Sequence, residues 1–168
     1  TVLLVSYPTS FSKESCDILK EHLKDLGAYR VYFEQEIWIA AIGAKLDLFL
    51  PVASCVLNIG SSNCDIAIFQ NGKMIKKSRC NVSGSTINIA IKNWLFNSYN
   101  INVSTKQVEK IKRKIGQVNI QQNPKSLEVV GMDQNSHVLK SAIINENQIV
   151  GILTLLVQQW ANWILQFL

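Results

Sequence analysis

The chain has 168 residues, of which 48% are hydrophobic and 17% are charged, a composition typical of a globular protein and unlike that of a disordered one. The net charge is +5, but the densest basic cluster, between Lys106 and Lys114, contains no aromatic residue, which argues against a single-stranded nucleic acid as partner. The four cysteines form no CxxC pair, and three lie in apolar runs, a pattern typical of reduced thiols in a cytoplasmic protein.

The first part of the chain alternates between apolar strands and helices. Residues 2–5 and 29–33 have the character of buried strands. Between them, apolar residues recur at helical spacing up to Gly27, which fits the position just after a helix end. A short apolar helix is expected over residues 36–43. This order of strand, helix, strand and helix predicts a βαβ unit with parallel strands.

A meander of three strands is predicted next, over residues 55–58, 65–69 and 74–80. Asn71-Gly72 has the composition of a tight hairpin turn and is expected to join the last two strands.

The following part predicts two helices and then a β-hairpin. The helices are expected at about residues 85–98 and 104–116, the strands at 126–130 and 137–144, and the turn at 131–135. Ser104 and Gln107 have the spacing of a capping box, and Ser85 is placed to cap the first of the two helices.

The last segment, residues 149–168, contains no charged residue, so its length alone allows a membrane span. Large apolar residues nevertheless leave one polar stripe along the predicted helix. The stripe consists of Thr154, Gln158, Asn162 and Gln166. We expect an amphipathic helix buried in the core. A helix that faces a partner and a helix in or on a membrane are the alternatives.

A tight turn of small polar residues lies between the first two strands of the meander. Such a turn can present backbone N–H groups to an anion, which makes it the strongest candidate for a phosphate-binding loop in this chain. It lacks a carboxylate, and an amide brings no charge to a hard cation, which disfavours Mg²⁺. A plain β-turn is the alternative. The candidate residues are Asn58, Gly60, Ser61, Ser62 and Asn63.

Three short motifs follow one another in a distinctive order. They are Ala-Ala-Ile-Gly at 40–43, Asp-Ile-Ala-Ile at 65–68 and Ile-Lys-x-x-Ile-Gly at 111–116. Over nearly the whole chain, this order resembles the second half of bacterial actin homologues of the MreB family. The third motif favours that family over heat-shock chaperones of the same superfamily.

The resemblance implies an α/β fold of the actin-like ATPase, or ribonuclease-H-like, kind, with a mixed sheet flanked by helices and a small α+β insertion lobe. Residues 1–82 and 145–168 would form the nucleotide-facing lobe, similar to subdomain IIA. Residues 83–144 would form the smaller lobe, similar to subdomain IIB.

The resemblance also assigns roles to residues, with ATP as the implied cofactor. Glu36 would position the water that attacks the γ-phosphate, the turn residues would contact the β- and γ-phosphates, and Ser83-Gly84-Ser85 would face phosphate or ribose. Glu109 and Lys112 would border the purine and ribose.

Each role has a structural alternative. Glu36 also suits a helix N-terminus, and nearby Glu34 is the other candidate for its position. Ser85 suits a helix cap, and Glu109 and Lys112 suit a solvated helix face.

The chain departs from the family pattern where nucleotide chemistry would occur. Two acidic positions are occupied by Asn58 and Ser85, and two glycines by Ser61 and Ser62, whose Cβ atoms would cost free energy if the turn needs positive φ. The resemblance therefore predicts a diverged family member that binds ATP weakly or hydrolyses it poorly.

The function implied is that of a cytoskeletal protein involved in cell shape. It would self-associate head to tail into filaments in the cytoplasm, with a membrane surface or a membrane-bound protein as a further partner. Contacts along the filament are expected around residues 98–103 and 121–135. The alternatives are an active ATPase of the actin, chaperone and sugar-kinase superfamily, and a non-nucleotide interaction module on the same fold.

Overall fold

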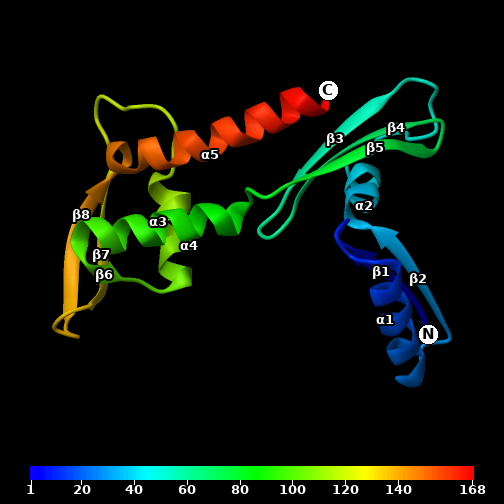
Figure 1. Cartoon of the computed structure of the whole chain (residues 1–168), viewed down its shortest axis with the longest axis horizontal. Coiled ribbons are helices and arrows are strands. Elements are labelled where there is room, and N and C mark those ends of the chain that lie inside the picture. The colour runs from blue at the N-terminus through cyan, green and yellow to red at the C-terminus, as the bar shows by residue number, and fades with distance from the viewer. The chain divides into compact units, whose positions relative to one another are not determined.

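The computed structural model describes residues 1–168 and divides into two compact units, Thr1–Cys80 and Asn81–Leu168 (Figure 1). The first unit contains β1 (Val2–Tyr7), α1 (Lys13–Asp25), β2 (Arg30–Gln35), α2 (Glu36–Gly43), β3 (Ser54–Ile59), β4 (Cys64–Gln70) and β5 (Lys73–Cys80). The second contains α3 (Gly84–Tyr99), β6 (Ile101–Asn102), α4 (Thr105–Ile115), β7 (Ser126–Asp133), β8 (Leu139–Asn145) and α5 (Glu146–Phe167).

The first unit opens with the predicted βαβ arrangement. Strands β1 and β2 pair in parallel from Val2 opposite Arg30 to Tyr7 opposite Gln35, and α1 connects them. Ser12 caps α1 by accepting a hydrogen bond from the Ser15 N–H. Gly27 follows the helix end with φ +95°, a left-handed conformation that glycine adopts without strain.

The predicted meander β3-β4-β5 is also present and antiparallel. Asn71 and Gly72 both have positive φ, 51° and 67°, as a tight hairpin turn of this kind requires. The parallel pair and the meander are separate sheets and not one mixed sheet, because no β1 or β2 residue is hydrogen-bonded to the meander as a strand neighbour.

Helix α2 packs on the meander and so fixes the position of its own first residue. Its side chains Ile37 and Ala41 are fully buried, and Trp38 meets Phe69 edge to face at 4.9 Å between ring centroids. The buried core of this unit consists of Ile37, Ala41, Leu48, Val56, Ala67 and Phe69. This packing places the start of α2 beside the β3–β4 turn.

The second unit has a three-stranded antiparallel sheet in the order β6-β7-β8, packed with helices on a larger core. The two-residue strand β6 was not predicted. The core consists of Ile91, Leu95, Ile101, Val103, Val108, Ile111, Ile115, Val129, Ile144, Ile149 and Leu153.

The predicted position of the β7–β8 turn is wrong. Gly131 lies inside β7, opposite Lys140, and His137 lies in the turn with φ +55°. Glycine is required at this strand position for close packing, since a Cβ there would lie 2.2 Å from Ile101 Cγ2 and 2.6 Å from the Asn102 oxygen. Gly131, which the sequence analysis placed in the turn, is therefore a strand residue whose missing side chain lets β6 approach β7 closely.

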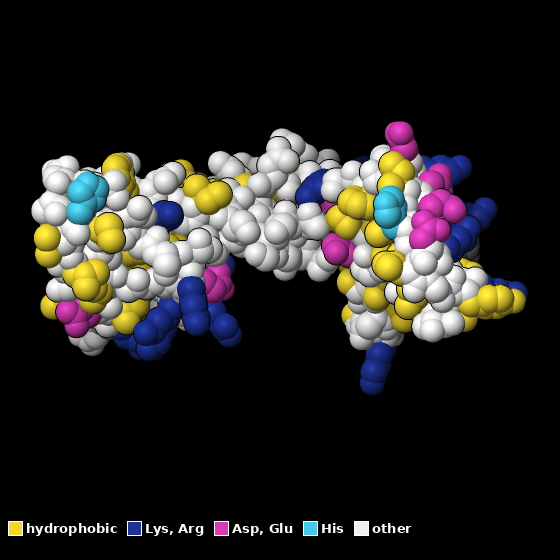
Figure 2. Space-filling model, turned by 90° about the horizontal axis from the view of Figure 1, so that it is seen from below, with side chains coloured by type: hydrophobic (Ala, Val, Ile, Leu, Met, Phe, Trp, Pro, Cys, Tyr) yellow, Lys and Arg dark blue, Asp and Glu magenta, His cyan; other side chains and the backbone are white.

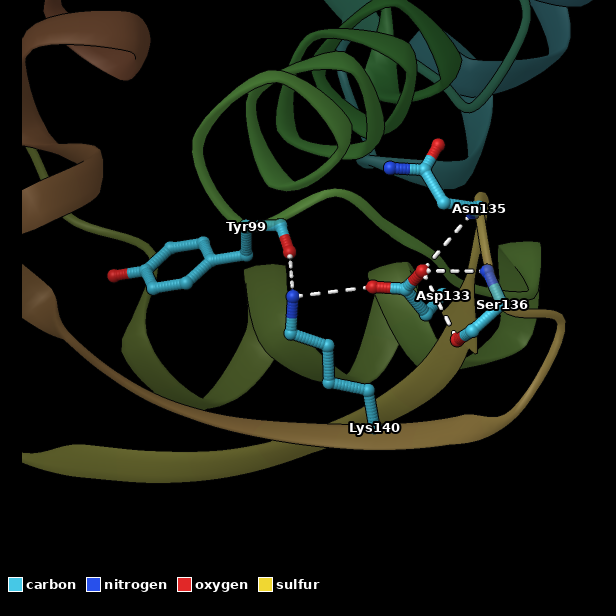
Figure 3. Close-up of polar contacts among 5 residues, drawn as sticks. All are labelled: Tyr99, Asp133, Asn135, Ser136 and Lys140. Atoms are coloured by element: carbon cyan, nitrogen blue, oxygen red, sulfur yellow. Dashed lines mark hydrogen bonds and ion pairs between the residues drawn. The ribbon is translucent and has the colours of Figure 1, made fainter.

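The β7–β8 turn is held by the carboxylate of Asp133 (Figure 3). Its Oδ1 accepts hydrogen bonds from the backbone N–H groups of Asn135 at 2.9 Å and Ser136 at 3.0 Å. Its Oδ2 lies 3.2 Å from Lys140 Nζ, which also donates to the Tyr99 carbonyl at 2.8 Å. The Ser136 and Asn135 N–H groups, and then Lys140, hold the pKa of Asp133 well below its ordinary value.

This low pKa predicts a pH-dependent contribution to stability. Because the folded-state pKa of Asp133 is depressed, its contribution is present above the unfolded pKa of about 4 and is lost as the pH falls below it. We expect Asp133→Asn to lower the urea midpoint at pH 6, and the difference from wild type to shrink towards pH 2. A difference that stays constant across this range would contradict the assignment.

Serine side chains cap the starts of α3 and α4, and one of the two predicted caps needs correction. Ser104 caps α4 by accepting from the Gln107 N–H at 3.3 Å, as predicted. Helix α3 begins one residue before Ser85, and Ser83 is its N-cap, forming a reciprocal capping box with Thr86. The expected cap by Ser85 is therefore wrong, because the preceding serine already serves the first turn.

Helix α5 is less buried than predicted. Ile149 and Leu153 lie in the core of the second unit, whereas Leu155 and Leu165 are 64% and 73% exposed. The helix is long and apolar enough to cross a membrane by length and composition, and 11% of its most apolar window is buried. Its contacts place α5 in the second unit. The predicted lobes instead group residues 145–168 with residues 1–82, and that grouping stays a prediction.

Candidate functional site

The candidate residues of the first unit gather around the β3–β4 turn. The Gly60 N–H closes the turn by donating to the Asn63 carbonyl at 2.7 Å. A Cβ on Gly60 would lie 3.0 Å from that oxygen, closer than ordinary packing allows. Ser61 and Ser62 are exposed and do not have positive φ, so the expected strain from their Cβ atoms is not found.

Glu36, and not Glu34, faces this turn. Glu36 is the first residue of α2, is half-buried, and its Oε2 accepts a hydrogen bond from Asn63 Nδ2 at 3.4 Å. The Glu34 carboxylate accepts from the backbone N–H of Gln35 at 2.9 Å. The packing of α2 on the meander thus brings together two of the predicted residues that are 27 positions apart in the sequence.

Two charged residues that sequence reasoning missed lie beside the turn. In the ladder, Asn58 is directly opposite Asp65, and Asp65 is directly opposite Arg79. Arg79 Nη2 donates a hydrogen bond to Asn63 Oδ1, so the Asn63 amide joins Arg79 to Glu36. We call Glu36, Asn58, Asn63, Asp65 and Arg79 the turn cluster.

Asp65 is the most buried member of the turn cluster, with 1% of its surface exposed. Its Oδ1 accepts from the Thr9 hydroxyl, but its Oδ2 is buried without a protein partner. A carboxylate oxygen in this state is costly unless a water, cation or ligand donor satisfies it. The sequence signal for this residue is an acid in an otherwise apolar strand.

The thiol next to Asp65 is not reactive at neutral pH. Burial first, and then the neighbouring Cys80 and Asp65, raise the pKa of Cys64 to about 11. A protonated, fully buried thiol is a poor nucleophile and a poor metal ligand. None of the four cysteines forms a disulfide bond. No group of three or more His, Cys, Asp or Glu side chains is arranged to hold a metal ion. The donor set at the turn therefore does not fit a metal site made by the protein alone.

The candidate residues of the second unit lie where α3 begins beside α4. Ser83 is 5% exposed, and Trp160 Nε1 fixes the preceding residue by donating to the Val82 carbonyl at 2.8 Å. Lys112 Nζ donates to the Gly84 carbonyl at 3.2 Å and lies 2.6 Å from Glu109 Oε2. The structure thus brings Glu109 and Lys112 beside Gly84 at the start of α3, a contact that the sequence did not predict.

Asn88 completes this second group and was missed from the sequence. Its Nδ2 donates to Glu109 Oε2 at 2.8 Å. The hydrogen bonds from Lys112 first, and then from Asn88, lower the pKa of Glu109, so its carboxylate is ionised at neutral pH. Asn88 Oδ1 is buried without a partner. We call Gly84, Asn88, Glu109 and Lys112 the helix-start cluster.

A cavity of about 230 Å³ adjoins the helix-start cluster. Ser85 and Asn88 both contribute to its wall. Its lining residues are Ser85, Asn88, Ile89, Lys92, Thr105 and Val108. On the outer side of α4, basic side chains gather on the surface of the second unit (Figure 2).

Solved structures similar to this chain include those of MreB5 and MamK. MreB5 of Spiroplasma citri bound to ADP matches 99% of this chain with a TM-score of 0.90 and 26% identity, over 50% of its own length. The same protein bound to AMPPNP matches with a TM-score of 0.89. A MamK double helical filament, at 12% identity and a TM-score of 0.69, shares the fold. The fold is thus that of the actin-like ATPases.

Sequence comparison narrows this class. The model of the MreB/Mbl protein family matches residues 1–168, and the chain belongs to that family. The cell shape-determining protein Mbl of Bacillus subtilis (strain 168) is 26% identical over 147 residues, which are 88% of this chain and 44% of Mbl. The cell shape-determining protein MreB of Escherichia coli (strain K12) is 25% identical over 148 residues, covering 88% and 43%. The chain thus spans less than half the length of these relatives.

Proposed function

We propose that this chain is part of an actin-like cytoskeletal protein that determines cell shape, binds ATP and self-associates into filaments in the cytoplasm. The observation that carries the proposal is the likeness of 99% of the chain, at a TM-score of 0.90, to an MreB that was solved with ADP. The names of its curated relatives as cell shape-determining proteins support the cellular role.

Each cluster has a proposed part in nucleotide binding. At the turn, the hydroxyls of exposed Ser61 and Ser62 are suited to donate to phosphate oxygens, and Gly60 keeps the turn tight. In the helix-start cluster, the ionised Glu109 is suited to accept from ribose hydroxyls, with Lys112 and Asn88 holding its carboxylate in place. Both groupings support the residue roles that the family resemblance implies.

The same geometry supports weak binding or slow hydrolysis. Asn58 and Ser85 bring no negative charge, so these two residues are poorly suited to orient a metal-bound water. The donors of the turn itself are neutral, and neutral hydrogen bonds to phosphate are weaker than charge-assisted ones.

The second candidate function is active ATP hydrolysis, which the position of Glu36 favours. Its carboxylate lies at the turn, where Asn63 donates a hydrogen bond to it. A carboxylate held beside bound phosphates is suited to position an attacking water. We expect Glu36→Gln, which keeps the shape and loses the charge, to lower phosphate release at least about tenfold if hydrolysis occurs. Glu34→Gln is the matched control. Equal phosphate release by wild type and Glu36→Gln would remove Glu36 from catalysis.

Self-association is proposed to use the outer face of the β7–β8 hairpin; β7 lies within the region 121–135 predicted for filament contacts, and β8 lies beyond it. Val130 and Met132 on β7 are 41% and 49% exposed, and Leu139 and Ile143 on β8 are 74% and 72% exposed. Hydrophobic side chains are visible at this end of the second unit in Figure 2. Exposed apolar residues that line one sheet face are typical of a protein contact.

Sedimentation with and without ATP tests the filament proposal. We expect the purified protein to pellet in a concentration-dependent way with ATP. The Met132→Glu variant should pellet much less, because the introduced glutamate would place a buried charge in the contact. Ser126→Glu, at the polar end of the same strand, should pellet like the wild type. Absence of a pellet under every nucleotide condition would contradict self-association.

A further inference from the structure

The turn cluster holds a positive charge that none of the proposed nucleotide contacts uses. Arg79 lies on β5 at the end of the meander that carries the Gly60 turn, in one cross-strand row with Asp65 and Asn58. Its side chain is exposed, and its guanidinium donates to the side chain of Asn63, the residue whose carbonyl closes the turn. The arginine is therefore anchored at the turn itself.

The guanidinium forms no ion pair with a carboxylate of the protein. The chain's ion pairs do not include Arg79, although arginines near carboxylates usually form them. Asn63 takes one of its five N–H donors, which leaves a planar set of donors of the kind that binds phosphate in a bidentate way. The side chains of the turn itself, from Asn58 to Asn63, carry no charge.

We propose that Arg79 binds the phosphates of a nucleotide at the Gly60 turn and supplies there the positive charge for which other sites use a divalent cation. Phosphate binding by this chain is then independent of metal. This inference rests on the proposed function, in which the turn contacts nucleotide phosphates, and it names the residue and the charge that make the contact strong.

Two further observations support this assignment. Lys77 lies two residues before Arg79 on β5, and strand residues two apart point to the same side. Its Nζ donates to Gln35 Oε1 at 3.3 Å, immediately before Glu36, so a second positive charge borders the same region. The Asn63 amide also holds the guanidinium in place before a ligand arrives, which reduces the entropy lost on binding.

The test measures the affinity of the purified protein for ADP and for adenosine by calorimetry, once with Mg²⁺ and once with EDTA. We expect wild-type affinity for ADP to differ by less than about threefold between the two conditions. Arg79→Gln should bind ADP at least about tenfold more weakly in EDTA, a change of about 1.4 kcal/mol, with adenosine affinity unchanged. Arg79→Lys should keep part of the ADP affinity, because it retains the charge and loses the planar fork.

Lys73→Gln is the matched control, since it removes one positive charge from the other end of β5 and should leave both affinities unchanged. A purely structural role of Arg79 would weaken adenosine and ADP binding equally and would overturn the inference. Wild-type ADP binding that is lost in EDTA, or that Arg79→Gln leaves intact, would also overturn it while the proposed function stands. Absence of nucleotide binding by the wild type in both conditions would overturn the inference and the proposed function together.

Discussion

Replacing Gly60 with alanine is expected to weaken ATP binding by at least about tenfold, which corresponds to about 1.4 kcal/mol. The added Cβ would lie 3.0 Å from the Asn63 carbonyl oxygen, which accepts the hydrogen bond that closes the turn. The turn must open to relieve this contact, and Asn63 then moves away from Glu36 and Arg79. Titration with a fluorescent ATP analogue measures the change.

Gly43→Ala provides the matched control for this change. It adds the same methyl group at the end of α2, in the same unit, where nothing lies within 4 Å of the new Cβ. We expect its affinity for ATP to stay within about twofold of the wild type. Equal affinities for Gly60→Ala and Gly43→Ala would show that the closed turn has no part in nucleotide binding.

Replacing Gly131 with alanine is expected to destabilise the second unit by about 1–3 kcal/mol or more, as overpacking of a filled core does. The new Cβ would lie 2.2 Å from Ile101 Cγ2, 2.6 Å from the Asn102 oxygen and 2.9 Å from Val103 Cγ1. Two of these neighbours are atoms of buried side chains and one is a backbone oxygen, so none can shift without a substantial cost in free energy. β6 would have to separate from β7.

Gly151→Ala is the control, and its effect has the opposite sign. Gly151 lies in the interior of α5 with nothing within 4 Å of a Cβ, so alanine should stabilise the helix by about 0.5–1 kcal/mol. Urea unfolding of both variants measures the two changes. A Gly131→Ala variant as stable as wild type would contradict the close approach of β6 to β7.

Much of the fold follows from local sequence patterns. The parallel β1–β2 pair, the meander with its Asn71-Gly72 turn and the Ser104 cap each depend on a signal carried by a few neighbouring residues, and all were predictable. Apart from the Ser85 cap, which was misplaced by two residues, the errors occur where tertiary contacts override such a signal. Gly131 looks like a turn residue, but it is needed for packing against Ile101, which is 30 positions earlier. The burial of α5 depends on what it packs against, which periodicity does not reveal.

The candidate site was partly predictable for the same reason. Family motifs point to Glu36 and the Gly60 turn, and the structure brings Glu36 to Asn63. Arg79 and Asn88 belong to no family motif, and Asp65, although it opens the motif at 65–68, was assigned no role at the site. They join the clusters through cross-strand register and through the packing of α3 beside α4. Pairing partners across strands are therefore the signal that sequence reasoning lacked.

The central claim is that this member of the MreB/Mbl family binds nucleotide despite the amide at Asn58 and the serines at Ser61 and Ser62. Calorimetric titration of the purified protein with ATP tests it most directly. We expect saturable binding of one ATP per chain, and competition by ADP. A titration that shows no saturable heat up to millimolar ATP, with the protein folded by circular dichroism, would contradict the account.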